Sequence, residues 1–212
     1  MTRQILITGA AGEIGCVLRA GLGDGMRRLR LLEIRPQKPA RKHEEIITAD
    51  LADIVGLEHA ARDVDCIVHL AGVPREGAWE AILPNNIVGT YNLFEAARKA
   101  GVKRVIFASS NHVIGYYRAD QAVGVIEPER PDSRYGVSKA YGEALGRLYA
   151  DKYGLEGACL RIGSFRERPQ DARQLATLIS HRVMVELTRC CIDAPAFHFL
   201  VLYGLSNNTR NR

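Results

Sequence analysis

The stretch RQILITGAAGEIG at residues 3–15 decides the fold. Its first half is an apolar run of strand length, and its second half spaces Gly9, Gly12 and Gly15 as GxxGxxG. Glycines let the backbone turn tightly and approach a pyrophosphate, while a helix that begins at Glu13 presents free N–H groups and the positive end of its dipole. A strand, a glycine loop and a helix in this order predict a dinucleotide-binding unit.

Apolar runs of strand length alternate with helical stretches along the rest of the chain. Strands are predicted at LRLLEI, EEIITA, CIVHLAG, VKRVIFAS and GACLRIG, and helices through Leu93 and from about Ser133. Because these strands are apolar on both faces, they belong in a parallel sheet that helices cover on both sides. The predicted fold class is α/β, a Rossmann-like doubly wound parallel sheet with a small C-terminal substrate-capping portion.

Composition excludes several classes of protein. No stretch approaches the roughly 18 apolar residues that span a bilayer, which excludes a membrane protein. The net charge of +5 comes from scattered arginines, which argues against nucleic acid as a partner. The five cysteines lack CxxC spacing, so we expect buried free thiols and no metal site. The first strand begins at Arg3, which leaves no room for a secretory leader and predicts a cytoplasmic protein.

Polar residues at the ends of later strands bear on the choice of cofactor. Glu33 follows the glycines by about 20 residues, where a carboxylate binds the ribose hydroxyls and repels a 2′-phosphate, so NAD is favoured over NADP. Arg35 can in principle hold such a phosphate. Asp50 either meets the adenine or caps the next helix, and these two interpretations stay open. We interpret His69, inside an apolar run, as a packed structural residue.

A second motif points to catalysis. Tyr135 and Lys139 form YxxxK at the start of a predicted helix, so the lysine can stabilise the tyrosine phenolate and make it a base near neutral pH. Ser110 follows a predicted strand 25 residues earlier, at the sheet edge where ligands bind. The structural alternative is an exposed tyrosine and lysine on a helix and a serine that caps a turn.

The order of these features resembles the extended short-chain dehydrogenase/reductase superfamily, which includes NAD-dependent epimerases and dehydratases. FASSNHVIGYY, YGVSKAYGE and LRIGS more specifically resemble bacterial uronate dehydrogenases. That resemblance implies oxidation of glucuronate or galacturonate by NAD at the anomeric carbon, giving an aldarolactone. It also implies Tyr135 as general base, Lys139 as its tuner and Ser110 as the hydroxyl that orients the substrate oxygen.

The resemblance also implies which residues bind the two ligands. Ser110, Asn111, His112 and Ser164 would bind the sugar, and the Arg173 guanidinium would hold its carboxylate. His112 can instead be a turn residue, and Arg173 a solvated surface arginine. The implied NAD contacts are Gly9, Gly12, Glu13, Ile14, Gly15, Glu33, Asp50, Leu51, Leu70, Ala71, Gly72, Asn86, Tyr135, Lys139 and Ile162.

The C-terminal part departs from a plain βα alternation. After Gly163 a polar loop, RERPQDAR, precedes an apolar helix around residues 183–192 and one more strand, HFLVLYG. We therefore divide the chain into an NAD-binding Rossmann domain at residues 1–163 and a partial substrate-binding portion at residues 164–212. The ending SNNTRNR stands where the family continues with aromatic residues and a helical segment, so the sequence resembles a member that lacks its C-terminal segment.

Two further departures and two rival functions stay open. Pro74 stands where the family has a serine, and Arg182 and Val183 stand where acidic residues are expected. The rivals are an epimerase or dehydratase acting on a nucleotide-linked sugar, and a non-catalytic NAD-binding module. The short stretch after Gly163 argues against the first, and retention of the YxxxK motif argues against the second. A homo-oligomer fits such domains, but the sequence selects no interface.

Overall fold

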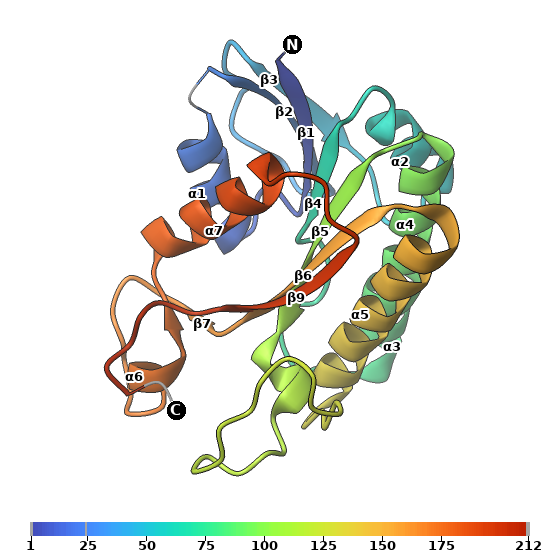
Figure 1. The fold of residues 1–212 in the computed structure, drawn as a ribbon. Helices are drawn as coiled ribbons and strands as arrows, with labels where there is room; N and C mark the ends of the chain where they lie inside the picture. Colours follow the sequence, from blue (N-terminus) through green and yellow to red (C-terminus); the bar gives the residue numbers. More distant parts are fainter. Residues whose placement is uncertain (1, 24, 211–212) are drawn as a thin grey trace.

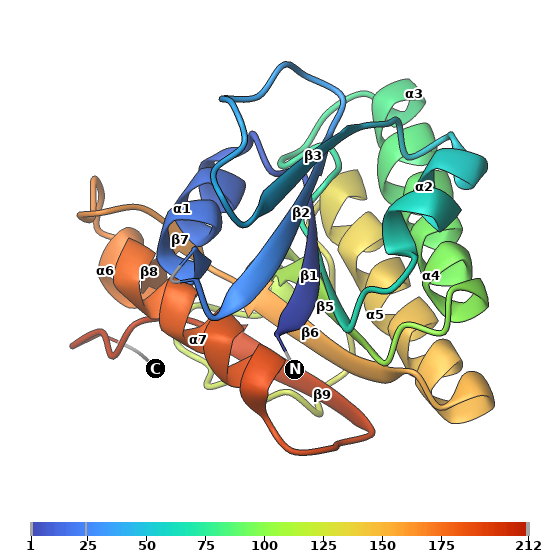
Figure 2. The ribbon, with the colours of Figure 1, turned by 90° about the horizontal axis from the view of Figure 1, so that it is seen from above.

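The computed structural model describes residues 2–23 and 25–210. Within these ranges the centre is a parallel sheet of seven strands, in the order β3-β2-β1-β4-β5-β6-β9 (Figures 1 and 2). The strands are β1 (Arg3–Thr8), β2 (Arg27–Glu33), β3 (Glu44–Thr48), β4 (Cys66–His69), β5 (Arg104–Ser110), β6 (Glu156–Ile162) and β9 (Phe199–Gly204). The predicted α/β class and doubly wound parallel sheet are confirmed.

Helices cover both faces of the sheet. One face carries α1 (Glu13–Leu22) and α7 (His181–Asp193), and the other carries α2 (Ile54–Ala61), α4 (Gly89–Lys99) and α5 (Arg134–Tyr153) (Figure 1). The shorter elements are α3 (Trp79–Ile82), the π-helical η1 (Leu83–Val88), the 3-10 helix η2 (Asn111–Ile114), β7 (Ser164–Phe165), α6 (Gln174–Thr177) and β8 (Leu178–Ile179). Across the described ranges, no helix has both the length and the apolar character required to cross a bilayer.

The central strand β1 is buried on both faces, as its unbroken apolar sequence predicts. Ile5 and Ile7 join the core cluster that contains Leu18 of α1, while Leu6 joins the opposite cluster with Phe94 of α4. Successive side chains of a strand point to opposite faces, so both cores draw on one strand. Because all strands of this sheet run parallel, their carboxyl ends lie at one edge.

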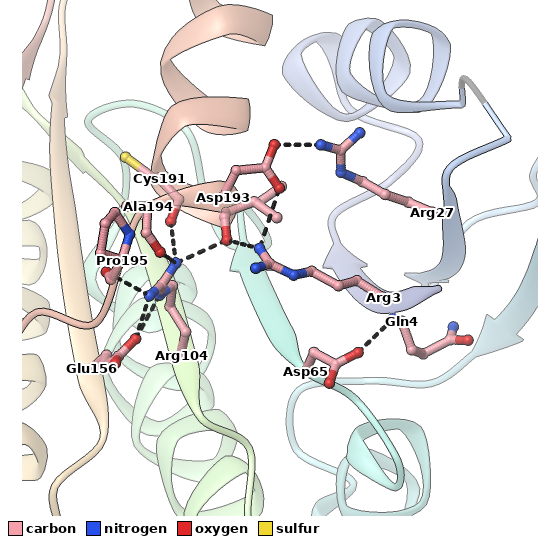
Figure 3. Close-up of polar contacts among 11 residues, drawn as sticks. Arg3, Gln4, Arg27, Asp65, Arg104, Glu156, Cys191, Asp193, Ala194 and Pro195 are labelled. Carbon is pink, nitrogen blue, oxygen red and sulfur yellow. Dashed lines mark hydrogen bonds and ion pairs between the residues drawn. The ribbon is translucent and has the colours of Figure 1, made fainter. Parts of the chain in front are cut away.

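The C-terminal end of α7 is fastened to the sheet by a buried arginine. The Arg104 guanidinium donates to the carbonyl oxygens of Cys191 at 2.7 Å, Ile192 at 2.8 Å and Pro195 at 3.2 Å, and it pairs with the buried Glu156 carboxylate (Figure 3). The last carbonyls of a helix have no partner within the helix, and Arg104 supplies one. The side chain therefore connects β5, β6 and α7.

Two elements that follow Gly163 belong to this core. Strand β9 pairs with β6 in parallel, and α7 packs beside α1. Asp193, at the end of α7, pairs with Arg3 at 3.2 Å and with Arg27 at 2.5 Å (Figure 3). The short pair β7 and β8 forms a separate two-stranded sheet near α6. The division of the chain at residue 163 stays a prediction.

The cysteines only partly follow the expectation of buried free thiols. All five are free, and Cys66, Cys159 and Cys191 are buried. The expectation is wrong for Cys16 and Cys190, which are exposed. Both lie on helices that cover the sheet from one side, and a residue on the outer face of such a helix meets solvent whatever its type.

Candidate active site

The carboxyl ends of the strands bring the predicted site residues to one edge of the sheet. The residue pairs in register at this edge are Thr8 with Leu32, Thr8 with His69, and Ser110 with Ile162. The glycine loop follows β1, Glu33 ends β2, and Leu70 follows β4. Open α/β sheets bind ligands at such an edge, beside the point where the strand order reverses, which here lies between β1 and β4.

The glycine loop is bent in a way that requires its first glycine. Gly9 has φ +70°, and a Cβ atom there would lie 2.8 Å from the backbone nitrogen of Ala71. The Gly9 carbonyl oxygen accepts a hydrogen bond from the Gly12 N–H at 3.0 Å, which closes the turn before α1. No side chain caps the first turn of α1, so its N–H groups are available to phosphate oxygens.

Glu33 is buried at the end of β2 and faces the glycine loop. Its carboxylate accepts hydrogen bonds from the N–H of Ala11 at 3.2 Å and of Ile34 at 3.0 Å. Arg35 is mostly exposed and turns back to pair with Glu33 at 3.4 Å. A carboxylate placed beside the glycine loop, with the nearby arginine paired to it, suits ribose hydroxyls better than a 2′-phosphate.

The helix after β3 is capped one turn later than Asp50. The Asp50 carboxylate accepts from the Ala52 N–H at 2.8 Å, whereas Asp53 is the N-cap of α2 and accepts from the Gly56 N–H at 2.9 Å. The alternative interpretation of Asp50 as the helix cap is therefore wrong. Leu51 is buried beside it. Asp50 is left in the turn that follows β3, at the ligand-binding edge.

Asn86 holds the loop after β4 rather than facing open space. Its side-chain oxygen accepts from the Val73 N–H at 2.7 Å, and its amide nitrogen donates to the Val73 carbonyl and to the Ser138 hydroxyl, each at 3.0 Å. The Ser138 hydroxyl in turn donates to the Tyr135 carbonyl oxygen at 2.7 Å. Asn86 thus ties the segment that contains Leu70, Ala71 and Gly72 to the helix that carries the YxxxK motif.

Ser110, Tyr135 and Lys139 come together in a buried cluster. Ser110 ends β5, while Ser133 caps the start of α5 by accepting from the Gly136 N–H at 2.9 Å, so the YxxxK residues occupy its first turns. All three side chains are less than 10% exposed. The Ser110 hydroxyl accepts from the His112 N–H at 3.2 Å and so caps η2, which confirms the alternative of a serine that caps a turn. The alternative of an exposed tyrosine and lysine is wrong.

Electrostatics in this cluster differ from the expectation that Lys139 lowers the Tyr135 pKa. Burial raises the pKa of Tyr135, and the polar Ser110 hydroxyl nearby opposes that rise. Burial likewise lowers the pKa of Lys139 to about 8. The Lys139 ammonium lies over two rings, 5.0 Å from the centroid of Phe107 and 5.5 Å from that of Tyr135. In a desolvated site the charged forms of both residues, the phenolate and the ammonium, become less favourable.

Only some of the residues predicted to bind the sugar lie near Tyr135. Asn111 and His112 directly follow Ser110 in η2, and the His112 ring packs edge-on against the Tyr135 ring with centroids 5.7 Å apart. Ser164, on β7, bonds the Thr177 hydroxyl of α6 at 3.0 Å. Arg173 stands just before α6 with an exposed side chain. The structure therefore brings His112 to Tyr135, whereas Arg173 and Ser164 lie on a separate segment.

Three residues of this region escaped the sequence interpretation. Glu76 accepts from the Tyr135 N–H at 3.0 Å and so holds the first turn of α5, although it lies in the loop after β4. Thr8 bonds the His69 ring at 2.7 Å, and His69 is buried with its pKa lowered by burial to about 3. Asp132 bonds His112. Thr8 could have been noticed in the sequence, because it is a polar residue at the end of an apolar strand. Nothing in the sequence indicated the contacts of Glu76 and Asp132, because their partners lie far away along the chain.

A cavity of about 540 Å³ opens beside the start of α1. Glu13 of α1 pairs with Arg166 at 3.0 Å, and the rings of Phe165 and His181 stack 4.6 Å apart. The lining residues are Glu13, Phe165, Arg166, Glu167, Arg168, Pro169, Gln170 and His181. The polar loop that follows β7 therefore lies beside the start of α1, where the glycine loop ends.

Comparisons with known proteins agree with this geometry. A model of the NAD dependent epimerase/dehydratase family matches residues 5–185. The uronate dehydrogenase of Pseudomonas putida is 47% identical over 206 residues, which are 97% of this chain and 77% of that relative. The resemblance stated from the motifs is therefore confirmed.

Solved structures extend the likeness to three dimensions. The glucuronic acid dehydrogenase of Chromohalobacter salexigens matches with a TM-score of 0.96 at 44% identity, over 100% of this chain and 79% of that one. A mutant uronate dehydrogenase from Agrobacterium tumefaciens, complexed with NAD, matches with a TM-score of 0.95 at 44% identity, over 99% of this chain and 79% of that one. By its motifs, its fold and these likenesses, this chain belongs to the NAD dependent epimerase/dehydratase family.

Proposed function

We propose that this chain is an NAD-dependent oxidoreductase that oxidises glucuronate or galacturonate at the anomeric carbon to an aldarolactone. The observation that carries the proposal is the buried cluster of Ser110, Tyr135 and Lys139, at the same edge of the sheet as the glycine loop. Its support is the likeness to uronate dehydrogenases, one of them complexed with NAD. The first turn of α1, which no side chain caps, and the buried Glu33 carboxylate fit that cofactor.

In the proposed reaction Tyr135 removes the proton of the anomeric hydroxyl. The bond between the anomeric carbon and its hydrogen breaks, and the carbonyl of the lactone forms. Bound NAD supplies the acceptor for the departing hydride. The Ser110 hydroxyl, in the same buried cluster as Tyr135, would orient the substrate oxygen. Lys139, with its pKa lowered to about 8, can pass a proton onward in mildly alkaline solution.

Binding of the sugar acid is assigned to groups at the same edge. Asn111 and His112 would read hydroxyls next to the reacting carbon, and Ser164 and Arg173 would hold the far end, with the guanidinium on the carboxylate. Holding the carboxylate fixes the anomeric hydrogen toward the cofactor, which brings the reacting atoms together. The predicted NAD contacts, from Gly9 through Ile162, remain part of the proposal.

The setting of the protein is also proposed. We place it in the cytoplasm, because its five cysteines are free, as thiols are in a reducing compartment.

We further propose that two copies pair through α4 and α5. Val137 and Leu148 of α5 are about half exposed, as is Tyr91 of α4, and these apolar side chains lie on neighbouring helices. Sedimentation velocity tests the pairing.

The decisive experiment follows NADH absorbance with NAD and D-glucuronate or D-galacturonate, beside glucose, galactose and UDP-sugars. We expect turnover with the uronates alone, and turnover confined to UDP-sugars would contradict the proposal. Tyr135→Phe should abolish turnover while NAD affinity stays nearly constant, because only the hydroxyl takes part in proton transfer. Tyr153→Phe on the exposed part of the same helix is the matched control. Near-normal turnover of Tyr135→Phe would remove Tyr135 from the mechanism.

A further inference from the structure

His112 and Asp132 form a closely bonded pair beside the proposed general base. The imidazole Nδ1 lies 2.9 Å from Oδ1 and 3.0 Å from Oδ2 of the Asp132 carboxylate. The pair joins two segments that carry chemistry, because His112 follows Ser110 at the end of β5 and Asp132 precedes the start of α5. The His112 ring also contacts the Tyr135 ring edge-on. The orientation of this imidazole is therefore coupled to both segments.

The Asp132 carboxylate is itself held in place. Its Oδ1 accepts from the Ser133 hydroxyl at 2.9 Å, and that hydroxyl also caps α5. The Asp132 N–H donates to the His112 carbonyl oxygen at 3.3 Å. Gly115 passes so close that a Cβ atom there would lie 2.0 Å from Oδ2. The backbone thus makes room for a carboxylate at this place and fixes its direction.

The chemistry of the pair determines where the imidazole carries its hydrogen. An ionised carboxylate only accepts hydrogen bonds, so the neutral ring facing it must carry its hydrogen on Nδ1. Nε2 then presents a lone pair. Among the described residues Nε2 of His112 has no hydrogen-bond partner, which leaves that lone pair for a ligand.

We infer that Asp132 is a positioning residue: it fixes His112 as the Nδ1–H tautomer, so that Nε2 accepts a hydrogen bond from a hydroxyl of the sugar acid. This inference rests on the proposed function for the identity of the ligand. The tautomer itself depends only on the pair, and it is measurable without substrate or turnover.

A second pair in the chain provides a matched control. His198 and Asp151 are also joined, with Nε2 2.6 Å from Oδ1, but both side chains are about half exposed and lie at the opposite end of α5. Asp151→Asn removes a carboxylate from a histidine in the same way as Asp132→Asn. It does so outside the proposed site.

The experiment compares the wild type, Asp132→Asn and Asp151→Asn by long-range ¹⁵N–¹H spectra of the histidine rings. Spectra are recorded about two pH units above the usual histidine pKa of ~6.5, and His112→Gln identifies the His112 signals by their loss. We expect Nδ1–H for His112 in the wild type. Asp132→Asn should populate the Nε2–H tautomer as well, because the amide of asparagine can donate a hydrogen bond to Nδ1 as well as accept one.

Kinetics and stability complete the test. Asp132→Asn should raise the KM for the uronate about 3- to 10-fold, the loss of one hydrogen bond, with a smaller change in kcat. Its Tm and NAD affinity should match the wild type, and Asp151→Asn should leave KM unchanged. An Nε2–H form of His112 in the wild type would overturn the inference, as would an unchanged tautomer and KM in Asp132→Asn. If the wild type turns over no uronate, the proposed function fails, while the spectra still decide the role of Asp132.

Discussion

Gly9→Ala is the substitution that most directly tests the shape of the glycine loop. Gly9 combines φ +70° with a neighbouring backbone, since an added Cβ would lie 2.8 Å from the Ala71 nitrogen and 2.9 Å from its Cα. Neither atom belongs to a flexible side chain. The loops after β1 and β4 must therefore separate to accept a methyl group. We expect Gly9→Ala both to destabilise the fold and to disturb the cofactor site.

The magnitude follows from two contributions. A residue other than glycine in the left-handed region costs about 1–2 kcal/mol, and forcing an extra methyl group into a packed place costs about 1–3 kcal/mol more. Gly154, at φ +72°, is the matched control because a Cβ there meets nothing within 4 Å. Gly154→Ala should therefore lose only the first contribution, about 1–2 kcal/mol. Gly9→Ala should lose about 2–5 kcal/mol.

Urea unfolding of both variants and NAD titration by calorimetry provide the measurements. We expect NAD affinity to fall by at least about tenfold in Gly9→Ala, or ~1.4 kcal/mol, because the Gly9 carbonyl anchors the turn that presents α1. Gly154→Ala should bind NAD like the wild type, since it lies at the far end of α5. Equal stabilities and equal NAD affinities in the two variants would refute the reasoning.

Three further predictions concern the fold and the substrate. Arg104→Met should lower the free energy of unfolding by about 3–5 kcal/mol in urea, because it leaves Glu156 buried without a partner; a loss below ~1 kcal/mol would contradict this role. Hydrogen bonds from Arg98, and then Tyr149, lower the pKa of Glu95 to about 2, so its contribution to stability is present above pH 4.5 and is lost as the pH falls toward 2. Acid unfolding of Glu95→Gln should show a shallower loss over that range, and an unchanged slope would exclude Glu95 as its source. Arg173→Ala should raise the KM for a uronate far more than for the matching neutral aldose, and equal changes in both would mean that Arg173 does not read the carboxylate.

Local patterns carried most of the prediction of the fold. The glycine spacing predicted the loop before α1, and the apolar runs predicted strands buried on both faces. Ser133 and the YxxxK motif predicted the start of α5, which begins at Arg134. These features are readable because each depends on residues close together in the chain. The cap of α2 was placed at Asp50 as one alternative, but two nearby aspartates compete for that position and Asp53 takes it.

Tertiary structure decided the pKa values in the site and the contacts that hold its side chains in place. YxxxK places Lys139 and Tyr135 on one helical face, yet burial by the surrounding chain raises the tyrosine pKa. The contact of Asp132 with His112 joins residues 20 positions apart.

The sequence alone determined the fold class, the glycine loop and which residues form the proposed catalytic cluster, because these depend on periodicity and short spacings. Only the folded chain decided how deeply each charge is buried and which carboxylate faces which imidazole. Desolvation and long-range contacts arise when distant strands and loops meet, and no local pattern of residues records them.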